Sequence, residues 1–122
     1  MNPKVNIISQ GLAENCYIVS NKRWSASTLV QWCKEKNYPI FKLPLAGINL
    51  SDMPFDVNNL DEFIYQCNRV NKVDLKYPII IDSIGRICDG YHRVVKAILE
   101  GKTEIDAIRI EEMPSPDGYE RE

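Results

Sequence analysis

The run Ile79–Ile81 constrains the fold of this chain more than any other segment. It is a continuous apolar run bounded by turn residues, which is typical of a strand buried on both faces. A strand of this kind needs other elements on both sides of its sheet. The segment Ser83-Ile84-Gly85 predicts a tight connection into a second short strand at Arg86–Cys88. We interpret Asp82 as the end of the first strand, with a place in a pocket as the alternative.

Strands and helices alternate along the rest of the sequence. Ser25 or Ser27 can cap the first helix, Asn58 or Asn59 can cap the second, and Gly101 can end the last. The order predicts an α/β fold, in the form of an α+β domain with a mixed sheet. We expect strands at Val5–Ser9, Cys16–Val19, Ile40–Leu45 and Ile105–Ile110, and helices at Ser25–Lys36, Asn59–Val70 and Tyr91–Glu100.

The composition is that of one compact globular domain, because 44% of the 122 residues are hydrophobic and 26% are charged. A net charge of −2 argues against a whole surface that binds nucleic acid. We expect a cytoplasmic protein without a membrane partner, since no apolar run approaches the ~20 residues that cross a bilayer and no signal peptide is recognisable. We divide the chain into an N-terminal extension (1–39), a main domain (40–112) and a loose polar tail (113–122).

The four cysteines, Cys16, Cys33, Cys67 and Cys88, form no closely spaced pair, and the chain has a single histidine. This spacing argues against a structural zinc site and against a disulfide framework. Each cysteine lies in or beside an apolar segment, so we expect four small buried residues.

The segment from Asp89 to Arg93 is the densest cluster of functional residue types. Gly90 at a strand-to-helix turn allows close approach of a ligand, and the new helix offers unpaired N–H groups that bind anions. His92 and Arg93 would lie in the first turn, where cations oppose the helix dipole unless an anion is bound. The alternative is that Asp89 caps the helix, His92 packs, and Arg93 pairs with a nearby acid.

The stretch from Pro78 to Ile110 resembles the ParB/sulfiredoxin superfamily. In that family an apolar strand, a hairpin and a second strand lead into a G-x-[HR]-R turn, which opens a helix that ends at a glycine. The matching positions are Gly90, His92, Arg93, Ala97 and Gly101. More loosely, the resemblance extends from about Ile40, whereas residues 1–39 have no counterpart. It implies a ParB/sulfiredoxin-like domain with an N-terminal strand–helix extension packed on the sheet edge.

The resemblance implies a site for a nucleoside triphosphate, ATP or CTP, with Mg²⁺. The phosphates would lie on the Gly90–Arg93 turn, with Asp89, Tyr91 and Lys96 beside them. His92 and Arg93 would support phosphoryl transfer or hydrolysis, as in an NTPase, a nuclease or a small-molecule kinase. Tyr91 replaces the acidic residue of partition proteins, which argues against their particular metal and phosphate contacts. It also replaces the cysteine of sulfiredoxins, which argues against peroxiredoxin repair. The alternative class is a non-catalytic, DNA-associated interaction domain of a mobile element.

Carboxylates before the second helix would border this pocket. Asp52, Asp56 and Glu62 are the candidate metal ligands, with Asp61 beside them, and the alternative is a solvated helix start that the dipole favours. Lys96 lies four residues after His92 and can reach the same phosphates, or it is an exposed helix lysine.

A nucleic acid or a protein is a candidate partner for residues 1–39. Trp24 follows Lys22 and Arg23, and an exposed tryptophan there could stack on a base. Trp32 lies at helical spacing from Leu29, and we expect it in the core.

Overall fold

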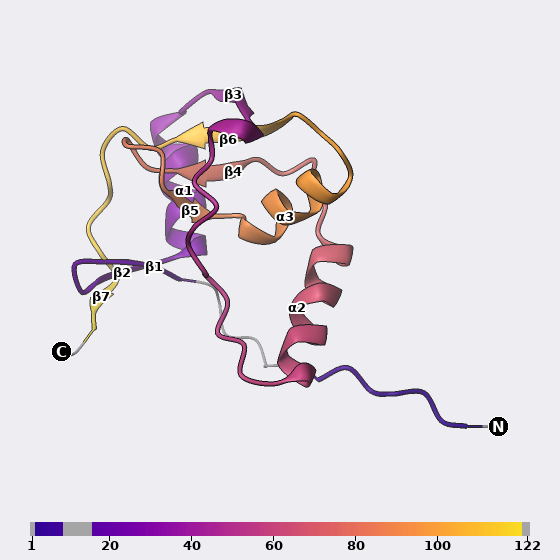
Figure 1. The fold of residues 1–122 in the computed structure, drawn as a ribbon. Helices are drawn as coiled ribbons and strands as arrows, with labels where there is room; N and C mark the ends of the chain where they lie inside the picture. Colours follow the sequence, from indigo (N-terminus) through magenta and orange to yellow (C-terminus); the bar gives the residue numbers. More distant parts are fainter. Residues whose placement is uncertain (1, 9–15, 121–122) are drawn as a thin grey trace.

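The computed structural model describes residues 2–8 and 16–120 and has a mixed α+β fold (Figure 1). None of its described helices is long and apolar enough to span a membrane. The elements are β1 (Cys16–Val19), β2 (Lys22–Ser25), α1 (Ala26–Lys36), β3 (Ile40–Pro44), a 3-10 turn (Leu45–Gly47), α2 (Leu60–Lys72), β4 (Ile79–Ile81), β5 (Ile87–Asp89), α3 (Tyr91–Leu99), β6 (Glu104–Arg109) and β7 (Gly118–Tyr119).

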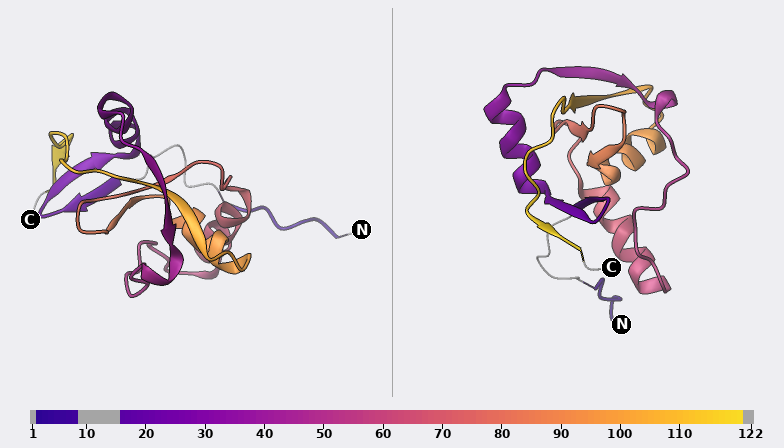
Figure 2. Two further views of the ribbon diagram at one scale, coloured as in Figure 1. Left: turned by 90° about the horizontal axis from the view of Figure 1, so that it is seen from above. Right: turned by 90° about the vertical axis from the view of Figure 1, so that its left-hand side faces the viewer.

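These strands form two sheets. The larger sheet has the order β3-β6-β4-β5, in which β4 runs parallel to β6 and the other neighbours are antiparallel. The smaller sheet has the order β1-β2-β7 and is antiparallel throughout. Residues 2–8 form no strand and extend away from both sheets (Figure 2), so the strand expected over Val5–Ser9 is wrong for the described residues, and Ser9 lies outside them.

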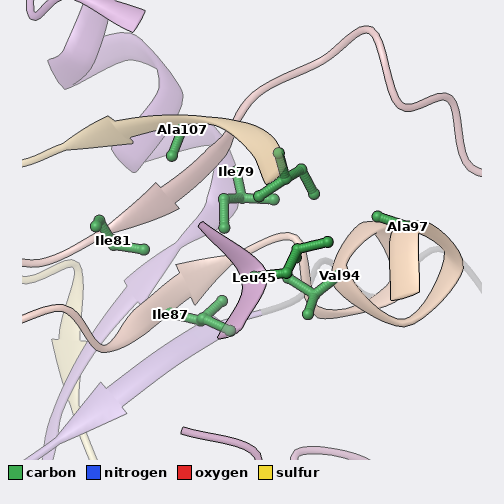
Figure 3. Close-up of a cluster of buried hydrophobic side chains, with 8 residues drawn as sticks. Leu45, Ile79, Ile81, Ile87, Val94, Ala97 and Ala107 are labelled. Atoms are coloured by element: carbon green, nitrogen blue, oxygen red, sulfur yellow. The ribbon is translucent and has the colours of Figure 1, made fainter. Parts of the chain in front are cut away.

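Strand β4 is buried on both faces, as its sequence predicts. Ile79 and Ile81 pack in a cluster with Val94 and Ala97 of α3 (Figure 3). Ile80 points to the opposite face, where a second cluster also contains Trp24, Leu29, Cys33, Cys88 and Ile110. Helix α1 therefore covers a face of the larger sheet, whereas β1 lies beside its edge strand β5. The expectation that the N-terminal unit packs on the sheet edge is thus confirmed for β1 and wrong for α1.

The helix boundaries follow local capping chemistry. The Ser25 hydroxyl accepts a hydrogen bond from the Thr28 N–H at 3.2 Å, and Asn37 ends α1 in the left-handed region. Asn59 begins α2 by accepting from the Glu62 N–H at 2.9 Å. Gly101 follows α3 at φ +77°, as predicted for a residue that closes a helix.

Helix α2 turns its most apolar face to the solvent. Leu60, Phe63 and Ile64 are 71%, 54% and 37% exposed, and Cys67 is exposed beside them. In Figure 1 the helix lies beyond α3, the one described element with which it makes extensive contact. Cys16 is exposed as well, so the expectation of four buried cysteines is confirmed only for Cys33 and Cys88.

Residues 111–120 are an integral part of the fold, so the prediction of a loose tail over 113–122 is wrong for its described residues. Strand β7 pairs with β2, and the carbonyl of Pro114 accepts from the Trp24 indole at 2.9 Å. Trp24 is only 5% exposed, so it offers no surface for stacking on a base. Trp32 is half-buried against the same cluster, and its indole donates to the Glu112 carbonyl at 2.7 Å.

Strand β2 was not predicted from the sequence. It is joined to β1 by Ser20 and Asn21, both at positive φ (50° and 59°). Two such residues form the tight turn whose twist suits a β-hairpin, and asparagine is favoured there. The pair Ser20-Asn21 is the local signal for this hairpin.

Candidate functional site

A cavity of about 790 Å³ opens in front of the β5–α3 junction. Its walls come from β1, from the loop that contains Asp52 and Asp56, from one face of α2, and from the turn at Gly90. Segments that are distant in the sequence therefore meet at the turn that sequence reasoning selected. We take this cavity as the candidate functional site.

The turn requires glycine at position 90. Gly90 has φ +108°, and a Cβ atom there would lie 2.6 Å from Cγ2 of Ile79. Gly90 is also the N-cap of α3, and no side chain among residues 2–8 and 16–120 caps the helix. Gly90, Tyr91 and His92 all line the cavity, so the uncapped positive end of α3 lies at its wall.

Arg93 lies beneath this turn and is not among the residues that line the cavity. Its Nη2 donates to Oδ2 of Asp89 at 3.1 Å, and the two side chains are only 17% and 16% exposed. The guanidinium thus has an internal anion as its partner, as in the alternative weighed from the sequence. Its Nε is buried and has no hydrogen-bond partner among the described residues.

His92 is a buried connection between α3 and α2. Its Nε2 lies 2.7 Å from Oε1 of Gln66 and donates to it, and its ring packs against Phe55 with the centroids 4.6 Å apart. Burial, followed by the positive charges of Arg69 and Arg93, lowers the pKa of His92 to about 4. The imidazole is therefore neutral at pH 7, which does not suit a cationic phosphate ligand.

Two other candidate residues are used within the fold. Lys96 donates to the carbonyls of Asn71 and Val73 at 3.0 and 2.8 Å, so it binds the C-terminal end of α2 and does not reach the turn. Glu62 accepts from the Asn58 N–H at 3.0 Å and completes the cap of α2. Lys96 is therefore not placed to contact a phosphate at the turn, and Glu62 caps α2, which does not suit the expected role of a metal ligand.

Asp82 is held at the end of β4, as the interpretation favoured from the sequence has it. It accepts from the Tyr17 hydroxyl at 2.8 Å and from Arg86 Nε at 2.7 Å. Burial alone would raise the pKa of Asp82, but the hydrogen bonds from Tyr17 and from the Arg86 backbone and side chain lower it. The carboxylate orders the β4–β5 connection.

Asp52 and Asp56 are the candidate metal ligands that line the cavity. The pKa of Tyr91 is raised by burial and then by the negative charge of Asp52, so this carboxylate lies near the turn. Within residues 2–8 and 16–120, no group of three His, Cys, Asp or Glu side chains is arranged to hold a metal.

The sequence analysis gave no site role to several lining residues, among them Tyr65, Arg69 and Arg86. Tyr65 and Arg69 are four residues apart on α2, with the guanidinium carbon 6.0 Å from the ring centroid. That spacing was a usable signal, but the apolar stripe of α2 points to the opposite face. Arg86 reaches the cavity because the β4–β5 hairpin places it there, and the sequence alone gives no sign of this.

A scan against protein-family models, a search of the curated proteins and a search of the solved structures found no match to this chain. The resemblance to the ParB/sulfiredoxin superfamily therefore stays a prediction.

Proposed function

We propose that the cavity binds a nucleotide through its phosphate groups at the start of α3. The observation that carries this proposal is the uncapped N-terminus of α3, which lies at the wall of a cavity of about 790 Å³. Free N–H groups and the positive end of a helix dipole favour a bound phosphate. Arg69 lines the same cavity and adds a positive side chain, as does Arg86, whose Nε is already bonded to Asp82.

The other walls have roles that fit the same ligand. Tyr65 offers an aromatic ring to a base. Asp52 and Asp56 are the residues that would contact a Mg²⁺ carried by the phosphates, and the ion would supply charge neutralisation there. Arg93 acts as a positioning residue, because it supports the turn from below through Asp89.

The cavity features argue for nucleotide binding, whereas phosphoryl transfer would also require a general base in the cavity. His92 is neutral, buried and already hydrogen-bonded to Gln66, so it is poorly placed to act as an acid. Asp52 or Asp56 would have to serve as base in a hydrolytic or kinase reaction. A non-catalytic interaction domain is the second candidate, and the exposed apolar face of α2 favours it.

Thermal denaturation with added ligands tests the nucleotide proposal. ATP, CTP, GTP and ADP are each added with Mg²⁺ and with a chelator, alongside tripolyphosphate and the free nucleosides. A ligand at about 100 times its Kd stabilises the fold by about 2.7 kcal/mol. In a chain of this size that corresponds to a melting temperature roughly 8–10 °C higher. Phosphate recognition predicts a shift with tripolyphosphate and none with nucleosides.

Two charge-matched variants make the test specific. Arg69→Gln removes a cavity charge, whereas Lys34→Gln removes an exposed charge on α1. We expect Arg69→Gln to weaken nucleotide binding about tenfold or more and Lys34→Gln to leave it unchanged. A melting temperature that does not change with any nucleotide or with tripolyphosphate would overturn the proposal. If the two variants weaken binding equally, the phosphates do not bind in this cavity.

A further inference from the structure

The exposed face of α2 carries a second inference, which is independent of the cavity. Four side chains with helical spacing form an exposed apolar stripe: Leu60, Phe63, Ile64 and Cys67. Single exposed apolar residues are common, but a contiguous stripe rimmed by polar residues marks an interaction surface.

The stripe and the cavity occupy opposite faces of the same helix. At 100° per residue, Leu60 and Cys67 lie about 180° from Arg69, which lines the cavity. Gln66 and the buried Val70 point toward α3, where Gln66 holds His92. A partner on the stripe therefore leaves the cavity open.

The charges along α2 indicate which partner fits. Asp61 in its first turn and Lys72 in its last turn lie on the same side of the stripe, whereas Glu62 and Arg69 lie toward the cavity at 100° per residue. Two such helices placed antiparallel bring the acidic start of each against the basic end of the other. A parallel arrangement would place Asp61 against its own copy, which is unfavourable.

We propose that this chain forms a two-fold symmetric homodimer through antiparallel packing of α2 on α2 of a second copy. The same surface serves both copies, as a two-fold interface requires. When Asp61 of one copy approaches Lys72 of the other, the two-fold axis passes close to Cys67, so Cys67 meets its counterpart there and Ile64 packs further along the partner helix. A helix of 13 residues is about 20 Å long, so the interface is small and the dimer dissociates on dilution.

Sedimentation of the full chain across a range of concentrations tests the proposal. We expect wild type to pass from monomer to dimer as concentration rises. Phe63→Glu should raise the dissociation constant at least about a hundredfold, because a symmetric interface places the new carboxylate in it twice. Val30→Glu is the matched control, since Val30 is a 39% exposed apolar residue on α1, and it should leave the dissociation constant unchanged. Circular dichroism checks that each variant is folded.

A mixing experiment tests the antiparallel orientation. Asp61→Lys and Lys72→Asp should each weaken self-association about tenfold, because each places like charges opposite one another twice. An equimolar mixture of the two variants should restore dimers, since both contacts in the mixed pair are then between opposite charges. The weakening of each single variant is specific to antiparallel pairing, because a parallel dimer of wild type would already place like charges together at both positions. Single variants that associate as well as wild type, or a mixture that does not restore dimers, would overturn the orientation.

Crosslinking of the cysteines requires no variant in the interface. A short bis-maleimide should link two copies of Cys16→Ser through Cys67, and should not link Cys67→Ser, which retains the exposed Cys16. Wild type that stays monomeric at every concentration would overturn the proposal. The stripe would then be covered by something other than a second copy, such as residues 2–8 or a different protein. Dimers that are insensitive to Phe63→Glu, or that crosslink only through Cys16, would overturn it as well.

Discussion

Replacing Arg93 distinguishes two roles for its guanidinium: direct binding of a phosphate, and an internal ion pair with Asp89. If the guanidinium binds phosphate directly, Arg93→Met should leave the free energy of unfolding unchanged and weaken ligand binding. The structure instead places Arg93 in an internal ion pair with Asp89, with both side chains less than one-fifth exposed. We therefore expect Arg93→Met to reduce stability and to leave the melting-temperature shift caused by nucleotides largely intact.

The expected size of the stability loss follows from burial and from the hydrogen bonds of the guanidinium. Removing one partner of a buried pair costs about 3 kcal/mol or more, because a carboxylate is left without its counter-ion. Arg93 Nε is buried and has no partner within the described part of the chain, so its removal returns about 1 kcal/mol. The net loss is about 2 kcal/mol, which lowers the melting temperature by roughly 6–8 °C.

Urea denaturation of a double-mutant cycle measures this coupling. Arg93→Met and Asp89→Asn should each destabilise, and the double variant should lose at least about 1 kcal/mol less than the sum of the two. The control is Lys42→Met, which breaks a 2.6 Å pair with Asp106 whose side chains are 65% and 30% exposed. That change should leave the urea midpoint nearly unchanged, because solvent screens an exposed pair. Additive effects in the cycle, or a stable Arg93→Met that no longer responds to nucleotides, would refute the ion-pair role.

Three further perturbations test the turn, the histidine and the C-terminal segment. Gly90→Ala should cost at least about 3 kcal/mol in urea denaturation and Gly101→Ala only about 1, because both residues have positive φ but only Gly90 is crowded. Burial and the nearby arginines lower the pKa of His92 to about 4, so its stabilising contribution is complete above pH 6.5 and is lost as the pH falls toward 4. Since this is the only histidine, His92→Gln should flatten the decline of melting temperature between pH 7 and 5. Asp117 accepts from the Ser25 N–H and the Thr28 hydroxyl at 2.7 and 2.9 Å, so Asp117→Ala should cost about 1 kcal/mol of unfolding free energy, and an unchanged midpoint would exclude this cap.

Elements specified by neighbouring residues were predictable from the sequence. The two-sided burial of β4 follows from three consecutive isoleucines, and the starts of α1 and α2 follow from Ser25 and Asn59. The hairpin after Asp82 and the closure of α3 at Gly101 are local in the same sense. In each case the information lies within about one turn of helix or one strand, where periodicity and capping act.

Contacts between distant residues account for what the sequence did not reveal. The segment after Ile110 contains the prolines and the glycine of a typical loop, yet Asp117 caps α1 from 92 residues away. Pro114 is fixed by the indole of Trp24 across a separation of 90 residues. The residues around Trp24 give no sign that Pro114 and Asp117 contact them, and the reverse is also true. Local composition therefore predicted a loose tail and an exposed tryptophan.

The turn at Gly90 shows why the candidate site could be located from sequence while the roles of its residues could not. A cation in the first turn of a helix opposes the dipole, and that conflict correctly indicated that an anion must lie near Arg93. The anion that the structure provides is Asp89, one strand residue before the turn, so the conflict is resolved within the chain. The uncapped N–H groups of α3 still lie at the cavity wall with Arg69 opposite. The case for an external phosphate therefore rests on the helix terminus and on α2, and no longer on the arginine that first suggested it.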